Sequence, residues 1–119
     1  MIAIIATHPD DLCPTEDGYD VDIGPFIMMF EYLTKKKATV IGKPNRLLLD
    51  LASSQMNIRA DEIAMVGDRL YTDMRMAWEN GIPSILVLTG ETTLDDLKDS
   101  DIKPTYVLDS VADIIRKVF

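Results

Sequence analysis

The sequence predicts an α/β fold in which a parallel sheet is covered by helices on both faces. Apolar runs at 63–66 and 84–88 lack the polar alternation of a half-exposed strand and are typical of strands buried on two sides. These runs alternate with segments of helical periodicity. From residue 43 onward the predicted order is therefore helix, strand, helix, strand, helix, strand, helix.

The first part of the chain predicts a strand, a loop and a helix. Residues 2–6 are uninterruptedly apolar, which fits a buried strand. Residues 7–23 are rich in proline, glycine and acidic side chains, so we expect a loop there. Pro25 then opens a helix. We expect its apolar stripe to pack in the core, and this stripe consists of Phe26, Met29, Phe30 and Leu33.

The middle of the chain predicts a short strand at 38–41 and helices on either side of the strand at 63–66. A Gly-Lys-Pro turn at 42–44 leads into the first helix. Its expected apolar face consists of Leu47, Leu48, Leu51, Ala52 and Met56. Thr72 caps the second helix, which ends near Gly81. Its expected packing side consists of Met74, Ala77 and Trp78.

The carboxyl-terminal third predicts two more strands and a closing helix. The strands are 84–88 and 106–108, with a short helical or loop segment around 94–97 between them. Ser110 caps the last helix. Its expected inward side consists of Val111, Ile114, Ile115 and Val118.

Composition and charge exclude several classes of partner. Twenty acidic residues against twelve basic ones give a formal charge of −8, and no segment concentrates enough Lys or Arg to follow a nucleic-acid backbone. No apolar run approaches the roughly 18 residues that a membrane span needs. The single cysteine, Cys13, excludes an internal disulfide. We therefore expect a cytoplasmic protein that binds neither nucleic acid nor a membrane.

The most informative stretch is residues 63–73, Ile-Ala-Met-Val-Gly-Asp-Arg-Leu-Tyr-Thr-Asp. Its spacing puts Asp68 at the carboxyl end of a strand and Asp73 just inside the next helix, where ligands of open α/β sheets bind. Carboxylates suit Mg²⁺, and a helix amino terminus tolerates a phosphate. Two helix-capping aspartates would have the same spacing, so both interpretations stay open.

Lys43 adds a cation to this pattern. It lies in the Gly-Lys-Pro turn immediately before a predicted helix. From there its ammonium group could reach a phosphate or the carboxylates that bind the metal. An exposed surface lysine is the alternative interpretation of the turn alone.

Several segments together resemble the haloacid dehalogenase (HAD) superfamily of phosphohydrolases. They are Ala-Thr-His-Pro-Asp at 6–10, Val-Ile-Gly-Lys-Pro at 40–44, Met-Val-Gly-Asp-Arg-Leu-Tyr-Thr-Asp at 65–73 and Ile-Leu-Val-Leu-Thr-Gly at 85–90. The resemblance is to the branch of the N-acetylglucosamine-operon phosphatase, 4-nitrophenyl phosphatase, phosphoglycolate phosphatase and pyridoxal phosphatase. It implies Mg²⁺-dependent hydrolysis of a small phosphorylated metabolite.

The same resemblance implies a role for each candidate residue. Lys43 matches the lysine that steadies the nucleophile and the transferred phosphoryl group. Asp68 matches a metal ligand, and Asp73 matches its acidic partner in the outer shell. His8 and Asp10 match a loop that approaches the substrate. His8 stands where the family usually has asparagine, so the leaving-group preference does not follow from the match.

The family's Asp-x-Asp-Gly-Thr segment, which supplies the nucleophile and the general acid and base, does not occur in these 119 residues. Asp20 and Asp22 have its spacing but no preceding apolar strand. The resemblance therefore implies a truncated chain. It consists of a cap-domain remnant at 1–38 and the carboxyl-terminal half of a Rossmann-like HAD core at 39–119.

Two functions are consistent with this half of a fold. The first is a Mg²⁺-dependent phosphatase that is inactive until a nucleophile is supplied, and the second is a non-catalytic interaction or regulatory module. In either case the strand at 63–66 would form an open, apolar sheet edge. We expect the chain to form a homo-oligomer through that edge or to pair with a separate amino-terminal half.

Overall fold

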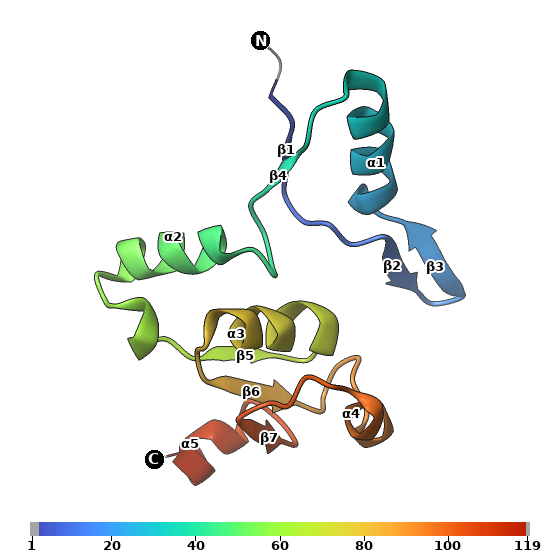
Figure 1. Ribbon diagram of the computed structural model, residues 1–119. Helices are drawn as coiled ribbons and strands as arrows, with labels where there is room; N and C mark the ends of the chain where they lie inside the picture. The colour runs from blue at the N-terminus through green and yellow to red at the C-terminus, as the bar shows by residue number, and fades with distance from the viewer. Residues whose placement is uncertain (1–2, 119) are drawn as a thin grey trace.

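The computed structural model describes residues 3–118, with side chains described through residue 116. It has an amino-terminal part, made of β1, the β2–β3 hairpin, α1 and β4, and a carboxyl-terminal part built on a three-stranded sheet (Figure 1). The segments that follow β1 and β4 connect these two parts, and both carry residues predicted to belong to the functional site. The α/β class that the sequence predicts is confirmed.

In the amino-terminal part, β1 (Ile5–Ala6) pairs in parallel with β4 (Thr39–Val40). Residues 7–23, predicted to be a loop, instead contain a hairpin of β2 (Leu12–Thr15) and β3 (Gly18–Val21). Both hairpin strands are exposed along their whole length, so no buried face imposes a hydrophobic alternation on the sequence. The Asp-Gly pair at 17–18 is the local hairpin signal that the prediction missed.

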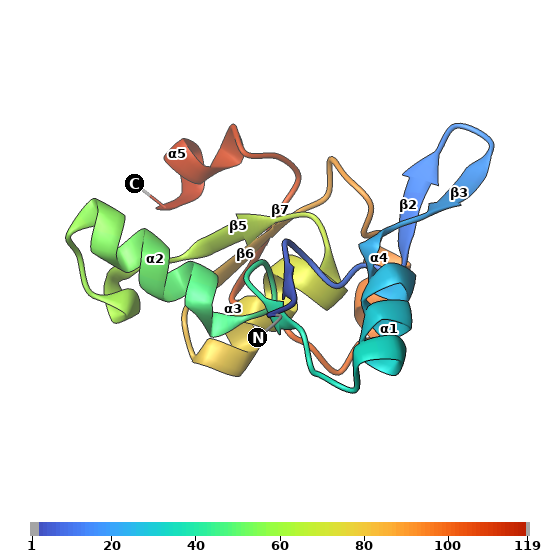
Figure 2. The ribbon, with the colours of Figure 1, turned by 90° about the horizontal axis from the view of Figure 1, so that it is seen from above.

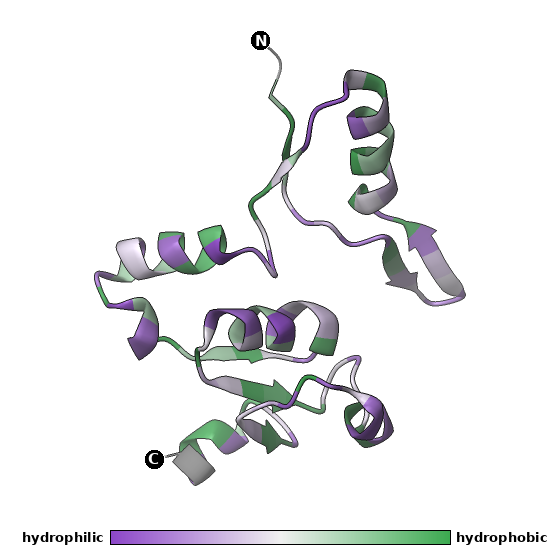
Figure 3. Ribbon diagram, viewed as in Figure 1, coloured by the Kyte–Doolittle hydropathy of each residue, from purple (hydrophilic) through white to green (hydrophobic). Residues whose placement is uncertain are grey.

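The helix α1 (Ile23–Thr34) begins two residues before the predicted start at Pro25. Asp22 is its N-cap, because the carboxylate accepts a hydrogen bond of 2.8 Å from the Ile23 backbone N–H. The expectation of a buried apolar stripe is wrong, since all four of its side chains are exposed: Phe26, Met29, Phe30 and Leu33. In Figure 2, α1 lies on the opposite side of the molecule from α2, and Figure 3 shows hydrophobic bands along its ribbon.

The carboxyl-terminal part follows the predicted alternation. Its elements are α2 (Arg46–Met56), the 3₁₀ turn η1 (Ala60–Glu62), β5 (Met65–Gly67), the π-helical turn η2 (Leu70–Met74), α3 (Arg75–Asn80), β6 (Ser84–Val87), α4 (Leu94–Asp99), β7 (Tyr106–Leu108) and α5 (Asp113–Val118). The strands are parallel in the order β5-β6-β7. In both ribbon views α3 lies on one side of this sheet and α5 on the other (Figures 1 and 2).

The core of this part is small and centred on β6, whose four residues are all buried. Its main cluster packs α2 against α3 and consists of Leu49, Met76, Ala77 and Ile82. On α2, Leu49 is the fully buried residue, and Leu48 packs partly against the cluster. The predicted face of α2 is therefore wrong in part, since Leu47, Leu51 and Met56 are exposed. A run of three leucines leaves the helical phase ambiguous, and tertiary packing decides it.

Details at the ends of the later helices also differ from the prediction. Thr72 lies within η2 and does not cap α3, which begins at Arg75. Trp78 is 62% exposed, so it does not pack in the core. Ser110 donates through its backbone N–H and hydroxyl to Asp113 Oδ2, at 3.1 and 3.3 Å, which is one half of a capping box, although α5 itself begins at Asp113. On the predicted inward side of α5, Val111 and Ile115 are exposed and only Ile114 is half-buried, while the side chain of Val118 lies outside the described ones.

The strand β5 lies at the edge of its sheet. Among the described residues no strand pairs with its other side, and Val66 on it is 39% exposed. This is the open edge that the sequence predicts, although what pairs with it stays a prediction. The proposed division after residue 38 also stays a prediction, and the pairing of β4 with β1 joins residues across it.

Candidate active site

Three segments meet at the carboxyl end of β5. Asp68 follows the last residue of that strand directly, Asp73 lies in η2, and Lys43 lies between β4 and α2. Lys43 Nζ donates a hydrogen bond to Asp73 Oδ1, although the residues are thirty positions apart in the sequence. The structure therefore brings the predicted cation and one of the predicted carboxylates into direct contact.

Asp73 is held by protein groups at both carboxylate oxygens. Its Oδ2 accepts a hydrogen bond of 3.2 Å from the backbone N–H of Arg69, while Oδ1 faces Lys43. Gly67 leaves the room that the carboxylate occupies, because a Cβ at that position would collide with Asp73. Asp73 itself is buried. A carboxylate with this environment is suited to orienting the lysine.

Asp68 is supported by the loop that follows β6. The backbone N–H of Glu91 donates to Asp68 Oδ2 at 2.8 Å, and the N–H of Thr92 donates to the Asp68 backbone carbonyl at 3.1 Å. A Cβ at Gly90 would collide with the Asp68 carboxylate, so this loop packs directly onto it. The sequence prediction did not include Glu91, because a backbone donor leaves no signal in the residue type.

His8 and Asp10 lie in the segment after β1, and each has a charged partner. His8 Nε2 is 3.0 Å from Asp22 Oδ1, and its Nδ1 is 3.0 Å from the Thr7 hydroxyl. The hydrogen bond from His8 lowers the pKa of Asp22 below its ordinary value. Asp10 Oδ2 is 3.7 Å from Arg69 Nη1. Neither partner was a predicted site residue.

A pocket of about 350 Å³ is lined by most of these side chains. It is lined by Thr7, His8, Asp10, Asp22, Gly42, Lys43, Leu48, Arg69 and Thr72. Asp73 is linked to this pocket through Lys43, whereas Asp68 is bonded to the loop after β6. The predicted site residues Lys43, His8 and Asp10 therefore line the same pocket.

The pocket could in principle hold a metal ion or an anion. Ligand atoms of His8, Asp10 and Asp22 lie within 4.8 Å of one another, which is close enough for a shared cation. However, these groups already bond to one another or to Arg69, and Lys43 and Arg69 bring two positive charges to the same wall. The lining thus combines two cations, Lys43 and Arg69, with two carboxylates, Asp10 and Asp22, and the carboxylate of Asp68 at the strand end suits a hard cation.

Comparison with known proteins decides the family. A model of the HAD-hydrolase-like family matches residues 40–114, which include Lys43, Asp68 and Asp73. The chain belongs to the HAD-like hydrolases. The matched range begins with β4 and ends within α5, so it covers the whole three-stranded sheet.

Named relatives of this HAD-like chain are phosphatases. The human glycerol-3-phosphate phosphatase is 32% identical over 94% of this chain and 38% of its own length. The sugar-phosphatase AraL of Bacillus subtilis is 35% identical over 95% of this chain and 41% of its own length. The ribonucleotide monophosphatase NagD of Escherichia coli is 32% identical over 92% and 43%. The chain thus spans less than half the length of the curated relatives it matches.

Solved structures agree with this assignment. The 4-nitrophenylphosphatase of Thermotoga maritima is 42% identical and superposes with a TM-score of 0.88 over 98% of this chain and 45% of its own. The p-nitrophenyl phosphatase of Archaeoglobus fulgidus is 32% identical, with a TM-score of 0.87 over 97% and 46%. The HAD fold is therefore shown for this chain. Among its described residues no helix is long and apolar enough to cross a membrane.

Proposed function

We propose that this chain supplies the lysine and the metal-binding side of a Mg²⁺-dependent phosphate monoester hydrolase. The observation that carries the proposal is the ion pair between Lys43 and buried Asp73, which follows Asp68 in the turn after the carboxyl end of β5. A buried carboxylate is costly unless it is paired, and here it is paired with the one cation that faces the pocket from the β4–α2 turn. Family membership supports the same assignment.

In this proposal each side chain has a separate task. Asp68 offers an oxygen ligand to Mg²⁺, which when bound neutralises charge on the phosphate oxygens. Asp73 holds the Lys43 ammonium in place without competing for the ion, because both of its oxygens already accept hydrogen bonds. Lys43 then stabilises the negative charge of the transferred phosphoryl group. These tasks require no movement of the β5–η2 turn.

The substrate proposed for this site is a small phosphorylated metabolite. A pocket of about 350 Å³ holds a compact molecule, and Lys43 on its wall offers a cation for a phosphate group. His8 and Asp10 would contact the part of the substrate beyond the phosphate. The named relatives act on glycerol-3-phosphate, sugar phosphates and ribonucleotide monophosphates, which are all in this size class.

The nucleophile must come from outside these 119 residues, because they contain no Asp-x-Asp-Gly-Thr segment. We propose that a strand bearing it pairs with the open edge of β5, which would place the nucleophile beside Asp68. The segment could belong to the same polypeptide or to a separate chain. We place the activity in the cytoplasm on the basis of the acidic composition.

The test of this proposal is turnover of 4-nitrophenyl phosphate by the 119-residue chain in the presence of Mg²⁺. We expect no turnover above the uncatalysed rate, because a lysine and a metal ligand cannot replace a covalent nucleophile. Asp68→Asn is the matched control. If the chain alone hydrolyses 4-nitrophenyl phosphate and Asp68→Asn abolishes this turnover, the proposal that the nucleophile is supplied from elsewhere is wrong.

The exposed apolar side of α1 favours a second candidate function, a non-catalytic interaction module. Phe26, Phe30 and Leu33 on this helix are 53%, 48% and 67% exposed, which is unusual for large apolar side chains that follow one another along a helix. An interaction module would bind its partner without forming a site for phosphate. Binding of a partner that Lys43→Ala and Asp68→Asn leave unchanged, with no hydrolysis under any condition, would favour this alternative.

A further inference from the structure

Arg69 occupies the centre of an ionic network that the proposed reaction does not use. Its Nε is 2.8 Å from Glu91 Oε2, and its Nη1 is 3.7 Å from Asp10 Oδ2. Tyr71 joins the network by donating its hydroxyl to Glu91 Oε1 at 2.8 Å. The Arg69 guanidinium also lies 5.9 Å from the centre of the Tyr71 ring. One side chain therefore contacts three different segments of the fold.

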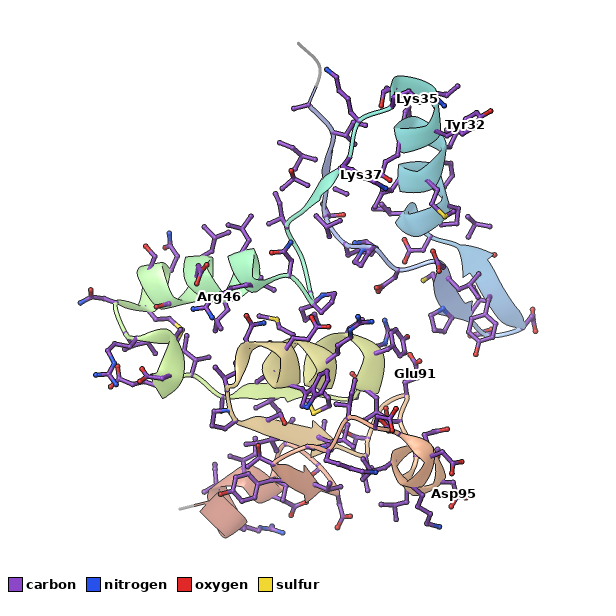
Figure 4. All side chains as sticks on the ribbon, viewed as in Figure 1. Tyr32, Lys35, Lys37, Arg46, Glu91 and Asp95 are labelled. Carbon is purple, nitrogen blue, oxygen red and sulfur yellow. The ribbon has the colours of Figure 1, made fainter. Side chains whose placement is uncertain are left out.

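These partners come from both parts of the molecule. Asp10 follows β1 in the amino-terminal part, whereas Glu91, labelled in Figure 4 on the side near the β2–β3 hairpin, follows β6 in the carboxyl-terminal part. Arg69 is adjacent to Asp68 in the sequence. The side chain of Asp10 is 17% exposed and that of Arg69 is 30% exposed, so their pairing is partly shielded from solvent.

The pKa values of Arg69 and Tyr71 are both raised in this network. Burial lowers the pKa of Arg69, but its neighbours, led by Tyr71 and Glu91, outweigh burial and raise that pKa overall. Burial and the bond to Glu91 raise the pKa of Tyr71 to about 12, so that its hydroxyl remains a donor. In space, the Arg69 guanidinium pairs with the carboxyl groups of both Asp10 and Glu91.

We infer that Arg69 is a positioning residue that clamps the segment after β1 to the loop after β6, which contacts Asp68. The Glu91 side chain pairs with Arg69, while the Glu91 backbone N–H donates to the Asp68 carboxylate. Holding one end of Glu91 therefore orients the other. This inference rests on the proposed function only where it concerns Mg²⁺. The joining of the two parts is a property of the fold itself.

The planar guanidinium is essential to this inference. It presents donors in a fixed fork, so it can face Asp10 with one nitrogen and Glu91 with another. A lysine at the same position has the same charge but a single ammonium group, and cannot span both carboxylates at these distances. Arg69→Lys therefore tests whether contact with both carboxylates is needed or whether the positive charge alone is enough.

The first experiment needs no metal. Two backbone amides report on the clamp in nuclear magnetic resonance spectra: Gly24 N–H, which donates to the Asp10 carbonyl at 2.8 Å, and Glu91 N–H. Arg69→Lys should shift both resonances. Arg59→Lys, which alters an exposed pair with Asp61, should shift neither. If only the Glu91 resonance moves, the clamp does not join the two parts, and if neither moves, the inference is wrong.

The second experiment is a Mg²⁺ titration followed at the Glu91 amide. Substitution of a residue that orients a metal ligand typically weakens metal affinity about 10-fold to 100-fold. Because Arg69 is partly exposed, we expect the lower figure, so Arg69→Lys should weaken Mg²⁺ binding about tenfold. Equal or tighter binding would overturn the positioning role. A wild-type chain without any Mg²⁺ response would contradict the proposed metal site and leave the metal-free shifts to decide the clamp.

Tyr71→Phe covers the case in which Arg69→Lys does not fold. This change removes the hydroxyl bonded to Glu91 and alters no charge near neutral pH. It should shift the Glu91 amide and weaken Mg²⁺ binding by about threefold, because the loss of one neutral-donor hydrogen bond is smaller than the loss of the clamp. An unchanged amide resonance in Tyr71→Phe would overturn the inference.

Discussion

Replacement of Asp73 by asparagine should lower the free energy of unfolding by about 1–2 kcal/mol. The buried carboxylate accepts hydrogen bonds from Lys43 Nζ and from the Arg69 backbone N–H. An amide of the same shape has one oxygen, so one of these donors would face an NH₂ group. A hydrogen bond to a charged group contributes about 1.5–3 kcal/mol. Lys43 is 42% exposed, so water replaces part of the lost hydrogen-bond energy, and the expected loss of unfolding free energy is therefore the smaller value of about 1–2 kcal/mol.

The assay is urea unfolding followed by circular dichroism, with Asp95→Asn as the matched control. Asp95 pairs with Lys98 at 2.7 Å, but both side chains are largely exposed, so its loss should cost less than about 0.5 kcal/mol. A double-mutant cycle with Lys43→Met should give a coupling of about 1 kcal/mol between Lys43 and Asp73. Equal losses in Asp73→Asn and Asp95→Asn, or a coupling near zero, would refute the view that the site is organised around this ion pair.

Three other predictions follow from the same contacts. The bond from His8 lowers the pKa of Asp22 below its ordinary 3.8, so this pair stabilises the fold above that pH and the stabilisation is lost as pH falls through the lowered pKa. Asp22→Asn should therefore flatten the acid side of a plot of unfolding free energy against pH. An unchanged acid side would show that the pair is not formed. Gly67→Ala, which drives a Cβ into Asp73, should cost about 1–3 kcal/mol in urea unfolding, and a neutral effect would be inconsistent with the close packing. Val66→Lys on the open edge of β5 should reduce self-association in sedimentation equilibrium, whereas an association constant equal to that of the wild type would mean that copies do not meet at this edge.

Strong periodicity and strand-end chemistry are what the sequence could reveal. The strand at 106–108 is found as predicted, and the alternating order after residue 43 is confirmed, because buried parallel strands are uninterrupted apolar runs. Lys43 and Asp73 also lie in contact, although Lys43 follows β4 and Asp73 follows β5, which belong to different sheets. Their catalytic roles stay predictions.

Features that depend on what covers a surface could not be predicted. The stripe on α1 has helical spacing, yet Phe26 and Leu33 are exposed, and the space between α1 and the residues of β1 is an open hollow lined in part by Phe26. The β2–β3 hairpin is missed for the opposite reason, since exposed strands need no alternation. Arg69 and Glu91 were overlooked because their importance comes from long-range pairing, which leaves no spacing in the sequence.

The most direct test of a divided phosphoryl-transfer site is complementation. The 119-residue chain would be mixed with the part of the Thermotoga maritima 4-nitrophenylphosphatase that it does not match, and 4-nitrophenyl phosphate turnover would be measured with Mg²⁺. We predict turnover in the mixture, none in either component, and loss of the gain with Asp68→Asn or Lys43→Ala. Restored turnover that survives both substitutions would contradict the assignment of these residues. A complex that forms without any turnover would contradict the catalytic account and favour the interaction module.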